Sequence, residues 1–179
     1  LELITEVEKA TFDELSFLLE GLEMNAEISK AGLDNKLGLG VGYNSKQAIS
    51  KGLLGDDLAN KAMYYTAAAS DARMSGISLP VMSSNGSGNN GLTAILPLLA
   101  YKDQFDVSDE RMVKALAISH LLNCYIKSEI GRLSALCSCG ISAATGSGAA
   151  ITWLMDGSRD QIAGTIQNMI ANLSGMICD

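Results

Sequence analysis

Apolar residues recur at every third or fourth position in several long segments of this chain, and that spacing favours helices as its main structure. Two long runs, over 112–122 and 162–173, show this period. A third run follows Thr11 and comprises Phe12, Leu15, Leu18, Leu19 and Leu22. Strand evidence is confined to short segments such as 77–81. We therefore predict one all-α domain of seven or eight helices, without an internal repeat or a domain linker.

Polar residues that cap helix ends mark where several of these helices begin. Thr11 with Glu14, and Ser158 with Gln161, match the pattern of a capping box. Acidic residues after Ser108 suit the positive first turn of another helix, and a further long helix starts near 56–57. The glycine-rich stretches 32–42 and 82–91 are predicted as loops. A buried helix is expected over 92–101, which Pro97 either kinks or opens.

The composition excludes several classes of protein. Apolar residues make up 47% of the 179 residues and charged residues 18%, which is typical of a folded chain. The net charge of −7 argues against a surface for nucleic acid or an anionic membrane. No apolar run reaches the roughly 20 residues of a membrane-spanning helix, and no signal-peptide layout opens the chain. We expect a cytoplasmic protein and interpret residues 1–179 as a catalytic domain cut from a longer chain at both ends.

The loop over 82–91 is the first candidate for chemistry. Gly86, Gly88 and Gly91 would let backbone N–H groups converge on an anion such as a carboxylate or phosphate. The following helix would direct its positive end at the same group. No Gly-Lys-Ser/Thr follows, so the loop is not a nucleotide-binding P-loop. The simpler alternative is a surface loop.

Cysteines and charged residues supply the other candidates. Thiolates can hold an iron–sulfur cluster, but the C-x-C spacing of Cys137 and Cys139 is unusual for one zinc site. Each cysteine could instead be a small buried apolar residue. His120 is the sole histidine, either a hydrogen-bonded core residue or a general base. Lys127, Glu129 and Arg132 form a charged cluster, which is either a solvated helix face or a site where Arg132 binds a substrate carboxylate. Asp71 and Arg73 form either an ion pair or a pair that supports the site from behind.

Four segments together carry a resemblance to a known family. Residues 82–97 resemble the Asn-Gly-Ser-x-Gly…Pro stretch of the iron–sulfur L-serine dehydratase α-chain family, and more closely its L-cysteine desulfidase and YhaM-like relatives. Residues 114–120 also resemble the desulfidase-like group. Residues 125–140 resemble the segment with the first cluster cysteine, and residues 172–179 the second, in which a Cys-Asp pair follows a small-residue helix. The resemblance extends from about Leu15 to Asp179.

This resemblance implies an α-helical catalytic domain with a [4Fe–4S] cluster held by three cysteines, one iron staying open for substrate. Cys178 matches the second ligand and Cys137 the first, with Cys139 as the alternative to Cys137. The third ligand of the family lies beyond the Cys-Asp pair, outside this chain. The family also has a separate N-terminal region, which is absent here.

The implied reaction is α,β-elimination of a small L-amino acid, L-serine or L-cysteine. The open iron acts as a Lewis acid on the substrate carboxylate and the leaving group, and a base removes the α-proton. The products are pyruvate and ammonia, with sulfide from cysteine. His120 and Lys127 are the candidate bases. The candidate substrate-binding residues are Ser83, Ser84, Asn85, Gly86, Ser87, Gly88 and Asn89.

Two other classes of function fit the sequence. One is a metal-free domain that binds a small carboxylate in the glycine loop, and the other is a helical structural or oligomerisation module. For the leading hypothesis we expect a small-molecule amino-acid substrate as partner, with no nucleic acid and no membrane. The Ala- and Gly-rich helices favour close packing, as in a homodimer, but the oligomeric state stays open.

Overall fold

The computed structural model describes residues 1–131 and 134–177, and this part of the chain is all-α, as predicted. Ile177, the last described residue, makes an isolated bridge to Leu136, and another bridge joins Ser84 to Ser87; the described residues contain no strand. The helices are α1 (Glu2–Lys9), α2 (Phe12–Leu15), α3 (Leu18–Asp34), α4 (Val41–Ser50), α5 (Leu58–Met74), α6 (Gly88–Lys102), α7 (Asp109–Ile130), the π-helix η1 (Cys139–Ala143), α8 (Ala144–Leu154) and α9 (Arg159–Leu173).

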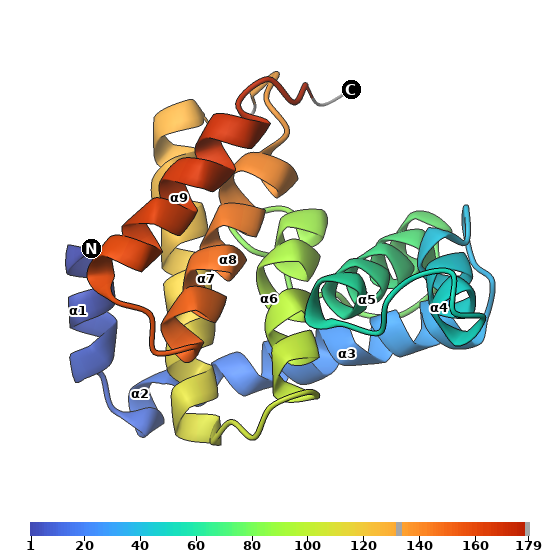
Figure 1. Cartoon of the computed structure of the whole chain (residues 1–179), viewed down its shortest axis with the longest axis horizontal. Helices are drawn as coiled ribbons and strands as arrows, with labels where there is room; N and C mark the ends of the chain where they lie inside the picture. Colours follow the sequence, from blue (N-terminus) through green and yellow to red (C-terminus); the bar gives the residue numbers. More distant parts are fainter. Residues whose placement is uncertain (132–133, 178–179) are drawn as a thin grey trace.

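Helix α6 occupies the middle of the fold (Figure 1). It packs against α5 on one side and against α7, α8 and η1 on the other, while α3 runs past both groups. Its side chains Ile95, Leu96 and Leu98 are fully buried. The glycine loop over 82–91 leads into the first turn of α6, and its residues contact both α7 and the segment that holds Cys137 and Cys139.

The predicted caps are present, although one helix is shorter than expected. Thr11, Ser108 and Ser158 each accept a hydrogen bond from the backbone of the first turn, and the capping boxes of Thr11 and Ser158 are complete. The expected helix after Thr11 is divided, because α2 ends at Leu15 and α3 starts at Leu18. Hydrogen bonds of the i→i+3 type at Ser16 and Phe17 turn the chain between them.

The prediction of a loop over 32–42 was wrong at both of its ends. Gly32 lies inside α3 and Gly42 inside α4, and both contact the backbone of Ala68 in α5. A Cβ atom at Gly32 would lie 2.1 Å from the Ala68 carbonyl oxygen, and one at Gly42 would lie 2.2 Å from the Ala68 nitrogen. These glycines allow close helix packing, while Gly38 and Gly40 form the turn with positive φ angles of 54° and 69°.

The loop over 82–91 also ends earlier than predicted. Helix α6 begins at Gly88, where the side chain of Ser87 accepts a hydrogen bond from the Asn90 backbone. Pro97 lies well inside this helix. Residues 77–81 form no strand. Within the described ranges, no helix has both the length and the apolar character needed to cross a membrane.

Candidate active site

The glycine loop is a tight turn that presents Ser84 to helix α7. Ser84 and Ser87 exchange two backbone hydrogen bonds, at 3.1 and 3.2 Å. Between them Asn85 and Gly86 have positive φ angles of 48° and 78°, a conformation for which asparagine and glycine are the most suitable residues. Ser84 is only 3% exposed. The loop is therefore anchored by its own backbone bonds and by the burial of Ser84.

Three polar side chains on one face of α7 lie against this loop. His120, Asn123 and Lys127 follow the spacing of three and four residues that aligns side chains along a helix. The Oγ atom of Ser84 lies 2.8 Å from Nδ1 of His120 and accepts a hydrogen bond of 2.8 Å from Nδ2 of Asn123. Nζ of Lys127 donates to the carbonyl oxygen of Asn85 at 3.2 Å. The structure thus brings together both candidate bases and the first half of the loop.

Burial lowers the pKa of His120 below its ordinary value of 6.5, because desolvation disfavours the charged imidazolium. The ring is accordingly neutral at pH 7. In the tautomer that donates from Nδ1 to Ser84, Nε2 carries the free lone pair that a general base requires. The described geometry therefore suits His120 to accept a proton.

We predict that the ring resonances of His120 titrate with a midpoint below pH 6.5. Since the unfolded chain takes up this proton near pH 6.5 and the folded chain does not, the free energy of unfolding should fall as the pH decreases below that value. NMR of the full-length protein labelled at histidine, assigned with the His120→Asn variant, measures the pKa directly. A midpoint at or above 6.5 contradicts the prediction.

Lys127 does not belong to a solvated charged face, which was one interpretation of the cluster at 127–132. It is 3% exposed, whereas Glu129 is exposed to solvent. Arg132 lies outside the described residues. A buried ammonium group is costly unless it is compensated, and the bond to the Asn85 carbonyl supplies part of that compensation.

The other loop residues are less uniformly placed. Ser83 and Gly86 are exposed. Gly88 and Asn89 contact Arg73 of α5, whose Nη1 donates to Oδ1 of Asn89 at 3.0 Å; a Cβ atom on Gly88 would lie 2.5 Å from Nε of this arginine. Arg73 thus supports the loop and does not pair with Asp71, which accepts a hydrogen bond of 3.0 Å from the Gly42 backbone.

Asn90 connects the loop to the cysteine segment. Its Nδ2 donates to Oγ of Ser138 at 3.0 Å and approaches Sγ of Cys139 at 3.6 Å. Cys139 opens the π-helix η1, a type of turn that occurs often at functional sites. The end of the glycine loop and the C-x-C pair therefore lie against each other, although Asn90 and Ser138 are 48 residues apart in sequence.

The two cysteine segments run side by side. The backbone N–H of Cys137 donates to the Met176 carbonyl at 2.9 Å, and Leu136 pairs with Ile177. Cys178 lies outside the described residues, but Ile177 is its neighbour in the chain. Within 1–131 and 134–177, no group of three or more His, Cys, Asp or Glu side chains could hold a metal ion. The backbone bonds of Cys137 and Leu136 thus join the segment around Cys137 to the end of the described chain at Met176 and Ile177.

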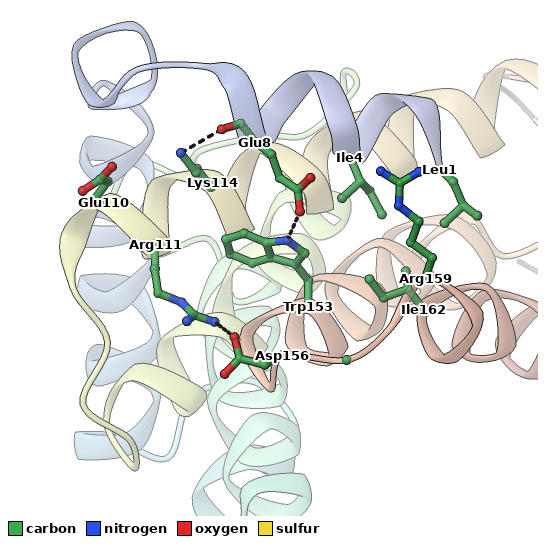
Figure 2. Close-up of a pocket in the computed structure, with 11 residues that line it drawn as sticks. Leu1, Ile4, Glu8, Glu110, Arg111, Lys114, Trp153, Asp156, Arg159 and Ile162 are labelled. Atoms are coloured by element: carbon green, nitrogen blue, oxygen red, sulfur yellow. Dashed lines mark hydrogen bonds and ion pairs between the residues drawn. The ribbon is translucent and has the colours of Figure 1, made fainter.

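A groove of about 380 Å³ adjoins this site between α5 and α6, and Ser70, Asn89 and Cys139 contribute to its walls. A separate pocket of about 410 Å³ lies between α1, α7, α8 and α9 (Figure 2). There Glu8 accepts a hydrogen bond from the Trp153 indole at 3.0 Å, and Arg111 pairs with Asp156 at 2.8 Å. These polar groups bond to one another and hold α1 against α7 and α8, and no predicted site residue lines the pocket.

Sequence reasoning missed Asn123. Its signal is an asparagine within an apolar helix, three residues after the sole histidine, where both side chains share one face. Asn123 and Asn90 are 0% and 1% exposed. Among the described residues, neither Oδ1 atom has a hydrogen-bond partner. Buried amide oxygens are rarely left unpaired, so each of the two can still accept a hydrogen bond.

Comparison with known proteins shows a match over nearly the whole chain. A family model described as serine dehydratase alpha chain matches residues 2–179. A UPF0597 protein of Clostridioides difficile strain 630 is 60% identical over 178 residues, which cover 99% of this chain and 42% of the relative. A UPF0597 protein of Alkaliphilus metalliredigens is 59% identical, covering 99% of this chain and 40% of that relative.

A more distant UPF0597 protein, of Desulforapulum autotrophicum, is 44% identical over 177 residues and has the same coverage of 99% and 40%. The chain therefore spans about two fifths of the length of the curated relatives it matches. The names of these relatives state no activity. No solved structure matches the chain.

Proposed function

This chain belongs to the serine dehydratase alpha chain family, and from that premise we propose that it is the core of a lyase that eliminates the β-substituent of a small L-amino acid. The substrate is L-serine or L-cysteine. Loss of the α-proton and of the β-hydroxyl or β-thiol gives an enamine, which tautomerises and hydrolyses to pyruvate and ammonia. The α-proton and the β-substituent together leave as water or hydrogen sulfide.

The observation that carries this proposal is the position of Asn90. Its amide nitrogen reaches Ser138 and Cys139, while its Oδ1 is buried without a partner in the described part of the chain. It thereby joins the loop suited to an amino acid to the segment suited to a cluster. A loop that merely closed the surface would need no unpaired acceptor at this contact.

His120 is the proposed general base. Its neutral ring can take the α-proton at Nε2 while Nδ1 stays bonded to Ser84. Asn123 fixes the other side of Ser84, so the imidazole keeps one orientation. General base catalysis of this kind contributes about 10²- to 10⁴-fold to a rate.

Cys137 and Cys178 are the proposed ligands of a [4Fe–4S] cluster, and Cys139 is the alternative to Cys137. Cys137 is preferred because its backbone is bonded to the segment that precedes Cys178. When bound, a cluster with an open iron supplies a Lewis acid that promotes departure of the β-substituent. We further propose a cytoplasmic location, where thiols are kept reduced.

We predict that Cys137→Ala and Cys178→Ala each remove most of the iron and acid-labile sulfide from the full-length protein after anaerobic reconstitution. The wild-type protein should hold about four irons per cluster and release pyruvate from L-serine or L-cysteine, the faster substrate identifying the activity. Cys139→Ala tests the alternative ligand. Cys124→Ser is the matched control, since Cys124 is an exposed thiol on α7, and it should retain the iron.

Iron content and pyruvate release that persist in both alanine variants contradict the cluster assignment. A wild-type protein that holds no iron and makes no pyruvate, yet is stabilised against heat by small carboxylates, would instead be a metal-free binding domain.

A further inference from the structure

Lys127 is a buried cation with a single hydrogen-bond acceptor among the residues that the structure describes. It is 3% exposed and donates to one described acceptor, the carbonyl oxygen of Asn85. The ion pairs of the described residues do not include it. An ammonium group has three donors and its burial is favourable only when a partner compensates the charge. The unfilled capacity points to an anion that joins the site.

Asn123 lies one turn away on the same helix and offers a hydrogen-bond acceptor where Lys127 offers donors. Its Nδ2 is committed to Ser84 at 2.8 Å, while its Oδ1 is fully buried and has no acceptor role within the described part of the chain. An amide oxygen that is buried without a donor destabilises the folded state. A ligand that brings an N–H donor would remove that cost.

Residues four apart on a helix have Cβ atoms about 5–6 Å from each other, so Lys127 and Asn123 can contact two groups of one small molecule. Lys127 bonds to Asn85 and Asn123 bonds to Ser84, and these two loop residues are neighbours in the chain. An α-amino acid carries an ammonium and a carboxylate on a single carbon atom. Its two charges match the two groups that α7 offers one helical turn apart: an amide oxygen without a donor and an ammonium group without an ion pair, both judged within the described residues.

We propose that Lys127 binds the α-carboxylate of the substrate and that Oδ1 of Asn123 accepts a hydrogen bond from its α-ammonium group. The inference rests on the proposed function for the choice of substrate, and it specifies the zwitterion as the recognised class. Lys127 is then a binding residue, because its ammonium group acts as a donor to the loop and to the ligand. The abstraction of the proton is left to His120.

The test compares three ligands that differ by one group. L-serine carries both charges, ethanolamine lacks the carboxylate, and 3-hydroxypropionate lacks the ammonium group. Calorimetry on the metal-free full-length protein measures binding without turnover. Lys127→Met should lower the affinity for L-serine and for 3-hydroxypropionate by about 10- to 100-fold, the range expected for a hydrogen bond to a charged group. The affinity for ethanolamine should stay unchanged.

Asn123→Leu should give the reverse pattern: it should lower the affinity for L-serine and for ethanolamine but not the affinity for 3-hydroxypropionate. Lys127→Arg keeps the charge and should restore part of the affinity for 3-hydroxypropionate, which preserves the test if the methionine variant does not fold. Lys114→Met is the matched control, because Lys114 lies on the same helix at the separate pocket (Figure 2) and should alter none of the three affinities.

Equal losses for all three ligands in Lys127→Met, or no loss for any, overturn the inference, as does a wild-type protein that does not prefer L-serine. Pyruvate release by the iron-loaded protein is read separately. If the protein releases pyruvate but the two variants do not show these opposite ligand preferences, only the zwitterion assignment is contradicted. If the variants show the opposite ligand preferences but no pyruvate is released, the zwitterion assignment is supported and the proposed lyase activity is contradicted.

Discussion

Replacing His120 by asparagine is expected to lower kcat for pyruvate formation by about 10²- to 10⁴-fold, the loss that follows removal of a general base. The asparagine amide can still bond to Ser84 from the position that Nδ1 occupies, but it cannot accept the α-proton. The loop should therefore keep its conformation, and KM should change much less than kcat. Steady-state assays of the iron-loaded full-length protein with L-serine and L-cysteine measure both constants.

The control for this variant is Ser128→Ala on the same helix. Ser128 is exposed and its hydroxyl bonds to the carbonyl of Tyr125 within α7, so its loss should leave kcat unchanged. An acid limb in the pH profile of kcat/KM is expected below pH 6.5, since the pKa of His120 is lowered by burial. Retention of wild-type kcat by His120→Asn would assign proton abstraction to another group.

Gly91→Ala is expected to destabilise the protein by about 2–3 kcal/mol, a cost typical of overpacking a filled interior. The added Cβ atom would lie 1.9 Å from the carbonyl oxygen of Met82. Met82 cannot move away easily, because fully buried Asn25 bonds to both its carbonyl oxygen, at 3.2 Å, and its N–H, at 2.9 Å. The substitution should therefore displace the start of α6 and with it the glycine loop.

Gly164→Ala is the matched control for this prediction. Gly164 also lies inside a helix, α9, but a Cβ atom added there would have no neighbour within 4 Å among the described residues. Alanine at this position should raise the free energy of unfolding by about 0.5–1 kcal/mol, since glycine is the poorer helix former. Denaturant unfolding monitored by circular dichroism measures both changes. Equal effects of the two substitutions would show that the contact with Met82 is not the cause.

Several parts of the candidate site could be named from the sequence one segment at a time. The loop over 82–91, His120 and the cysteine segments were each identified from local composition and from the family resemblance. Their contacts were not predictable, because no local pattern states that Ser84 meets His120, 36 residues away, or that Asn90 meets Ser138. Asn123 also contacts Ser84 across a long stretch of sequence. The only sign of this in the sequence is its place on the same helix face as His120.

The sequence by itself determined the all-α class and several helix starts, because the apolar period and the caps at Thr11, Ser108 and Ser158 act over three to four residues. Tertiary structure alone decided that Lys127 is buried and that Gly32 and Gly42 lie inside helices. It also decided that Leu136 pairs with Ile177. The physical reason is that burial and close approach depend on which distant segment covers a residue, and a local pattern of residue types does not contain that information.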